Sequence, residues 1–143
     1  MSDVAAESKP NPSQPIAVFP YPCGEEFQTA VAGGQHPLLA VPNEFIVVRG
    51  GLKPLPPTGT TISCSAGPDL ASAGCAVPYG QLRWATTGAI RASGGTVTWI
   101  PEYSPRGTMN LQHVNVIEGV ASAFSDAVSN PVSKADRIDG GKR

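Results

Sequence analysis

Residues 44–49 carry the clearest strand pattern in the chain. Four consecutive apolar positions, 45–48, lie between a Pro-Asn pair and a Gly-Gly pair, and three of the four are β-branched. β-Branched and aromatic residues favour strands, and a strand that is apolar on both faces must be covered on both. The pattern therefore predicts a buried central strand over residues 44–49, with Arg49 emerging at its C-terminal end.

Two later segments alternate apolar and polar residues, as half-buried strands do. One covers residues 96–100, and the other covers residues 112–118. In the second segment, a regular strand places Glu118 on the opposite face from His113, so the two side chains should not share one site. We interpret His113 as a buried, hydrogen-bonded structural histidine.

Residues 81–85 predict a further strand that leads directly into a helix. The hydroxyl pair Thr86-Thr87 can cap this helix, which should continue through Ser93 and end at the glycines that follow. A second short helix is expected at residues 24–34, where acidic residues precede apolar residues at helical spacing and glycines follow.

The rest of the chain is dominated by loop-forming residues. Residues 52–79 are rich in Pro, Gly, Ser and Thr and predict a long loop, with residues 60–63 adding at most a short edge strand. We expect a disordered or extended tail at residues 1–19 and a polar C-terminal tail at residues 126–143.

Composition sets the size and class of the fold. The chain has 143 residues, of which 16 are Gly, 15 are Pro and 41% are hydrophobic, enough for one small domain with a modest core. We predict a single α+β domain over residues 20–125. It should contain a small, mostly antiparallel β-sheet, one or two short helices and long Pro/Gly-rich loops.

The charge pattern argues against several classes of partner. Ten Lys and Arg balance eleven Asp and Glu, without a long block of like charge, which gives no basic surface for duplex nucleic acid. No apolar run approaches the roughly 20 residues that span a bilayer, so no membrane association is expected. The N-terminus has neither the basic start nor the apolar core of a signal peptide, which predicts a cytoplasmic location.

The three cysteines, Cys23, Cys64 and Cys75, show no spacing typical of a metal site. Because a cytoplasmic location is expected, we predict three reduced thiols and no bound metal. Cys64 and Cys75 flank a flexible stretch, and they are the pair expected to meet if a disulfide does form.

Polar residues occupy the ends of three predicted strands: Arg49, the pair Thr86-Thr87, and Glu118. Ligand sites favour such positions because the backbone is rigid up to the functional atom. A guanidinium can grip a diphosphate, and a carboxylate can stabilise positive charge that develops at an anomeric carbon.

The order Arg, hydroxyl pair, Glu resembles the Arg–Ser/Thr–Glu type of mono-ADP-ribosyltransferase, particularly the compact bacterial toxin domains. The resemblance implies NAD as cofactor, Glu118 as catalytic residue, and Arg49, Thr86 and Thr87 as cofactor-binding residues. It also implies a toxin effector whose partners would be a protein target or a cognate antitoxin.

Each of these residues also has a purely structural interpretation. In this interpretation Arg49 pairs with a nearby carboxylate, Thr86-Thr87 only caps a helix, and Glu118 is a solvated strand end. Two further expectations are that Trp84 and Trp99 pack in the core and that Arg83, Arg91 and Arg106 are solvated. On this interpretation the chain is a non-enzymatic protein-binding or accessory module. The sequence does not indicate its oligomeric state.

Overall fold

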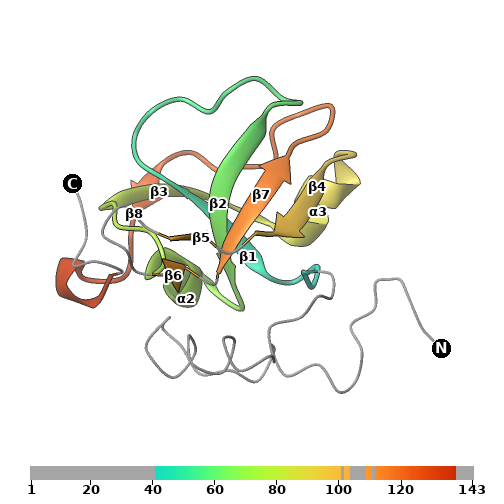
Figure 1. Cartoon of the computed structure of the whole chain (residues 1–143). Helices are drawn as coiled ribbons and strands as arrows, with labels where there is room; N and C mark the ends of the chain where they lie inside the picture. The colour runs from blue at the N-terminus through green and yellow to red at the C-terminus, as the bar shows by residue number, and fades with distance from the viewer. Residues whose placement is uncertain (1–40, 101, 104–108, 111, 138–143) are drawn as a thin grey trace, which may run out of the picture.

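The computed structural model describes residues 41–100, 102–103, 109–110 and 112–137. Within these residues, six strands form one antiparallel sheet in the order β4-β7-β2-β1-β3-β8, with two short α-helices (Figure 1). The strands of the sheet are β1 (Ile46–Gly50), β2 (Thr61–Gly67), β3 (Gln81–Thr86), β4 (Thr96–Trp99), β7 (His113–Ile117) and β8 (Val128–Ser129). The remaining elements are β5 (Glu102–Tyr103) paired with β6 (Met109–Asn110), the helices α2 (Leu70–Gly74) and α3 (Thr87–Ala92), and the 3-10 turn η3 (Lys134–Asp136). The predicted α+β class with an antiparallel sheet is confirmed.

Strand β1 is central, as its composition predicted. It pairs with β2 on one side and β3 on the other, and the side chains of Val47 and Val48 are 0% exposed. Successive side chains of a strand point to opposite faces, so these two valines belong to different parts of the core. We call the face that carries Val47 the core face and the other the α2 face.

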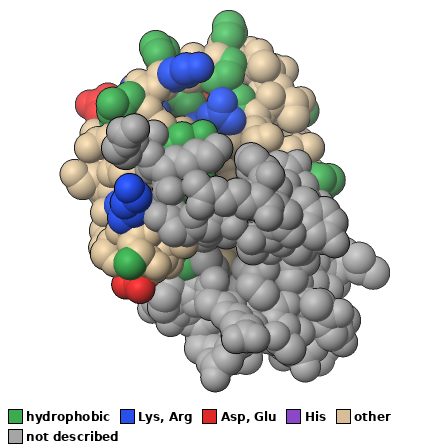
Figure 2. Space-filling view, turned by 60° about the vertical axis from the view of Figure 1, so that its left-hand side comes forward, with side chains coloured by type: hydrophobic (Ala, Val, Ile, Leu, Met, Phe, Trp, Pro, Cys, Tyr) green, Lys and Arg blue, Asp and Glu red, His purple; other side chains and the backbone are tan. Residues whose placement is uncertain are grey.

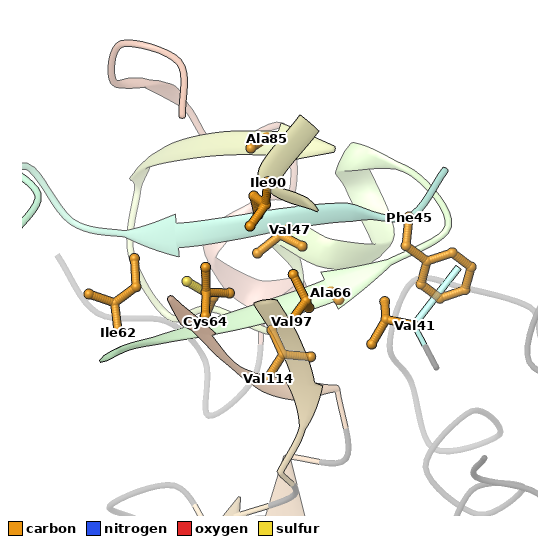
Figure 3. Close-up of a cluster of buried hydrophobic side chains, with 11 residues drawn as sticks. Val41, Phe45, Val47, Ile62, Cys64, Ala66, Ala85, Ile90, Val97 and Val114 are labelled. Carbon is orange, nitrogen blue, oxygen red and sulfur yellow. The ribbon is translucent and has the colours of Figure 1, made fainter. Parts of the chain in front are cut away.

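The core face holds the larger hydrophobic cluster (Figure 3). Val47, Cys64 and Val114 contribute from three neighbouring strands, and Ile90 of α3 packs onto them. The full set of buried members is Val41, Phe45, Val47, Ile62, Cys64, Ala66, Ala85, Ile90, Val97, Val114 and Val116.

A smaller cluster lies on the α2 face. Val48 and Leu82 pack there with Ala73 of α2 and with Val77. The two helices therefore cover opposite faces of the sheet, and β1 is protected on both sides as a doubly apolar strand requires.

The expectation of a long loop over residues 52–79 is wrong. This segment contains both β2 and α2, and β2 lies between β7 and β1 rather than at an edge. Helix α2 begins at a capping box in which the Asp69 side chain accepts from Ser72 N at 2.9 Å while Asp69 N donates to Ser72 Oγ. A Cβ at Gly67 would lie 2.4 Å from Ser72 Oγ, so the small residues that resembled a loop allow close helix–sheet packing.

The predicted order of strand, cap and helix at residues 81–93 is confirmed. Thr86 is the N-cap of α3, and its side chain accepts from Ala89 N at 3.0 Å. Strands β4 and β7 are also found where alternation predicted them, with Val97 and Val116 buried.

The sheet continues beyond residue 125, into the segment expected to be a C-terminal tail. Strand β8 pairs with β3, and the buried Asn130 side chain donates to Gly74 O at 2.9 Å and to Tyr79 O at 3.0 Å. The tail and the helix expected at residues 1–19 and 24–34 lie outside the described residues.

Candidate functional site

Arg49 and Glu118 lie at the same end of the sheet and on the same face. Strands β1 and β7 are both antiparallel to β2, so they are parallel to each other, but β7 extends further: Val48 pairs with Ser65 of β2, whereas Ile117 pairs with Thr61. Arg49 follows Val47 by two residues and Glu118 follows Val116 by two, which places both on the core face. Both also act electrostatically on Cys64 of β2, the strand between them. The structure therefore places two of the predicted residues on one face, but four residues separate their levels along the strands, about 13 Å at the usual strand rise.

Each of these two side chains is held by a backbone group rather than by the other. Arg49 Nη1 donates to Ser63 O at 2.9 Å. The partner of Arg49 is therefore a backbone carbonyl and not the carboxylate of the structural interpretation. Glu118 is 3% exposed, and its Oε1 accepts from Ala123 N at 2.5 Å. Glu118 is therefore a buried acceptor and not the solvated strand end of the structural interpretation.

Residues 119–127, which we call the crossover segment, bury Glu118. They run from the end of β7 to the far edge of β3, where Ser125 N donates to Trp84 O at 2.8 Å and Ser125 Oγ accepts from Trp84 N at 3.1 Å. On the way, Ala123 and Phe124 pack against the core cluster. The crossover segment thus closes the core face at this end.

Thr86 and Thr87 lie at the opposite end of the sheet. Thr86 is paired with Ile46, three residues from Arg49 along β1, or about 10 Å at the usual strand rise. Thr87 is fully buried, and its Oγ1 donates to Phe45 O at 3.0 Å. Both hydroxyls serve the start of α3, and the structure does not bring them to Arg49 and Glu118.

A second arginine lies beside Arg49, although the sequence predicts it to be solvated. Arg83 of β3 is the direct cross-strand partner of Arg49. Arg83 is half-buried; its Nη1 lies 3.4 Å from Ser125 O, and its Nε is buried without a hydrogen-bond partner. The sequence does show that Arg83 and Ala85 lie on the same face of β3, because they are two residues apart. That this face is also the face of Arg49 follows only from the β1–β3 register.

The structure agrees with the predictions for His113 and Trp99 but not with the prediction for Trp84. His113 is buried on the α2 face, and its Nδ1 lies 2.6 Å from Ile100 O, consistent with a structural histidine. Trp99 packs against the core cluster, edge-to-face with Phe45 at 6.3 Å between ring centroids. Trp84 is 36% exposed, so the expectation that it packs in the core is wrong.

The cysteines differ from the predicted set of three reduced thiols. Cys75 is disulfide-bonded, whereas Cys64 is a free buried thiol, so the pair considered from the sequence does not form. Cys23 lies outside the described residues. Burial raises the pKa of Cys64 to about 12, with Arg49 opposing this shift and Glu118 adding to it. The thiol is therefore protonated at neutral pH and unsuited to act as a nucleophile.

Two exposed apolar side chains lie at the end of the sheet where Arg49 and Glu118 are found. Leu52, in the loop that follows β1, is 68% exposed, and Val120, at the start of the crossover segment, is 92% exposed. Gly59 N donates to Glu118 O at 3.2 Å and joins the two loops. We call this the loop end of the sheet; both loops are at the top of Figure 1.

Among the described residues, no helix has the length and apolarity needed to cross a membrane. No family model, curated protein or solved structure matches the chain.

Proposed function

We propose that the chain is a protein-binding module that contacts its partner through the loop end. The observation that carries this proposal is the exposure of Leu52 and Val120 on two adjoining loops. Binding residues are often found on loops that a rigid scaffold positions, and exposed apolar side chains supply the area that a partner can bury. The parent strands β1 and β7 are separated by one strand, so their axes lie about 10 Å apart.

The contacts beneath these loops favour a preformed binding surface. Glu118 holds Ala123 from below, and Gly59 ties the preceding loop to the end of β7. Loops that are already ordered lose less conformational entropy on binding, which leaves more of the contact energy for affinity. Glu118 is then a positioning residue rather than a catalytic one.

The disulfide at Cys75 favours an oxidising compartment as the place of action. Disulfides persist in secreted, periplasmic or surface proteins and are rare where cellular thiols are kept reduced. This proposal differs from the cytoplasmic location expected from the N-terminal sequence.

The binding proposal is tested with the double substitution Leu52→Asp and Val120→Asp. Quantitative mass spectrometry would compare proteins retained by the wild-type chain, by the double variant and by a control, Ala135→Asp, at an exposed position of η3. A partner retained by the wild type and the control but lost from the double variant, and then bound by the purified wild type, supports the proposal. Identical retention by all three proteins contradicts it.

A second candidate function is an NAD-dependent ADP-ribosyltransferase-like domain, in the manner of a bacterial toxin effector with a protein target or antitoxin. It is favoured by one observation, that Arg49 and Glu118 share an end and a face of the sheet. Its catalytic step would require the crossover segment to open, because Glu118 is covered. The Thr86-Thr87 pair would have to act from the other end.

Calorimetry with millimolar NAD tests this second candidate. Arg49→Ala should weaken NAD binding, whereas Glu118→Gln should leave binding nearly intact and lower turnover by about a hundredfold or more. If the wild-type chain binds no NAD, the ADP-ribosyltransferase proposal is wrong and the protein-binding module stands alone.

A further inference from the structure

We propose that Arg49 and Arg83 form a binding site for a tetrahedral oxyanion, a phosphate or sulfate group, at the loop end of the sheet. The inference starts from their register, since the two residues are direct partners across β1 and β3. The Cβ atoms of such a pair lie about 4.5–5.5 Å apart, and like charges placed directly opposite each other destabilise a sheet. A bound dianion would remove this repulsion.

The protein itself leaves most of the hydrogen-bonding capacity of the two guanidinium groups unused. A guanidinium has five N–H donors, of which Arg49 uses one on Ser63 O and Arg83 uses one, at 3.4 Å, on Ser125 O. Neither arginine forms an ion pair with a carboxylate of the described residues.

The strongest single indication is Arg83 Nε, which is buried and has no hydrogen-bond partner. A buried donor attached to a permanent charge is costly to leave unsatisfied. An oxyanion seated between the two guanidinium groups would accept from their unused Nη groups and would offset the cost of this buried positive charge. Forked donors of this kind match the oxygens of phosphate and sulfate.

The surrounding charges also favour an anion. Glu118 is the acidic group that, like Arg49, acts electrostatically on Cys64. Its Oε1 already accepts a hydrogen bond from Ala123 N. Two arginines and one carboxylate leave a formal charge of +1 on this face, and the sum stays at +1 when Lys53 of the adjoining loop and Asp126, the residue after Ser125, are both counted. In Figure 2, which is turned about the vertical axis from Figure 1, Lys and Arg side chains lie close together at the top of the view. Both arginines are half-buried, so a small anion can reach them from solvent.

This site does not rest on either candidate function. A free phosphate ion and a phosphoryl group on a larger molecule offer the same chemistry, so the test needs one arm for each source. Inorganic phosphate and O-phosphoserine are the two probes, with sodium chloride at matched ionic strength as the reference.

Proton–nitrogen correlation spectra of the arginine side chains, together with calorimetry, provide the readout on the full chain. Inorganic phosphate should shift the Nε–H resonances of Arg49 and Arg83 and give a saturable heat of binding. Arg49→Gln or Arg83→Gln should weaken binding about tenfold or more, because each removes a charged donor group. Arg91→Gln, whose residue bonds Asn43 at the other end of the sheet, is the matched control and should bind as the wild type does.

Arg83→Lys keeps the positive charge but removes the forked N–H donors of the guanidinium group. This variant keeps the test decisive if a glutamine variant fails to fold. We expect it to weaken phosphate binding while leaving the melting temperature near that of the wild type. Tighter binding of O-phosphoserine would identify a phosphorylated molecule as the source, and equal binding would identify the free ion. Absence of both shifts, or binding that is unchanged in Arg83→Gln and Arg83→Lys, overturns the site.

Discussion

The carboxylate of Glu118 accepts a hydrogen bond from the backbone N–H of Ala123 at 2.5 Å and so anchors the crossover segment to the end of β7. Ala123 and Phe124 of that segment pack on the core cluster. Glu118, which the sequence predicts to be catalytic, thus has a clear structural role.

Glu118→Ala should lower the free energy of unfolding by about 1–3 kcal/mol, because the partly buried N–H of Ala123 loses its acceptor. Glu118→Gln keeps an acceptor oxygen and should cost less. Urea denaturation gives both values, and hydrogen exchange at Ala123 should accelerate only in the alanine variant. Equal stability of Glu118→Ala and the wild type would show that the anchor contributes nothing.

Val47→Asp should destabilise the protein by several kcal/mol and prevent soluble expression, because it places an unpaired charge in a fully buried position of β1. Thr98→Asp is the control, since Thr98 is an exposed strand position on β4. Soluble yield and thermal unfolding measure the difference. A soluble, cooperatively folded Val47→Asp protein would contradict the central placement of β1.

Thiol titration of the denatured, unreduced protein should count one thiol per chain. The chain has three cysteines, Cys75 is disulfide-bonded and Cys64 is free, so the disulfide leaves one thiol. In the native protein this thiol should react slowly, because Cys64 is buried with its pKa raised to about 12. A count of three would restore the fully reduced set expected from the sequence.

Raising the pH should lower stability through Cys64. The pKa of Cys64 is raised from 9.0 to about 12 on folding, so above pH 9 the unfolded chain releases a proton that the folded chain keeps. The stabilisation is complete below pH 9 and is lost as the pH rises towards 12, by about 1.4 kcal/mol per pH unit at most. The unfolding free energies of the wild type and Cys64→Ala, compared between pH 8 and pH 10, should converge as the pH rises. A constant difference would contradict this linkage.

Local pattern was enough to predict several elements. The apolar run of β1, the alternation of β4 and β7, and the cap at Thr86 all depend on residues close in sequence. Strand β2 was missed because Ala and Gly are poor strand formers, and helix α2 was missed because its five residues are too few to show helical periodicity. These residues become favourable only where tight packing rewards small side chains, as at Gly67 against Ser72.

The sequence by itself determined the antiparallel α+β class, the central strand and the strand-to-helix cap, because periodicity and capping act over a few residues. Only the tertiary structure decided that Arg83 faces Arg49, that Glu118 is buried, and that the hydroxyl pair lies at the other end of the sheet. These facts depend on register and strand order between segments far apart in the chain. Register and order are set by which faces can be buried together, and no single segment encodes them.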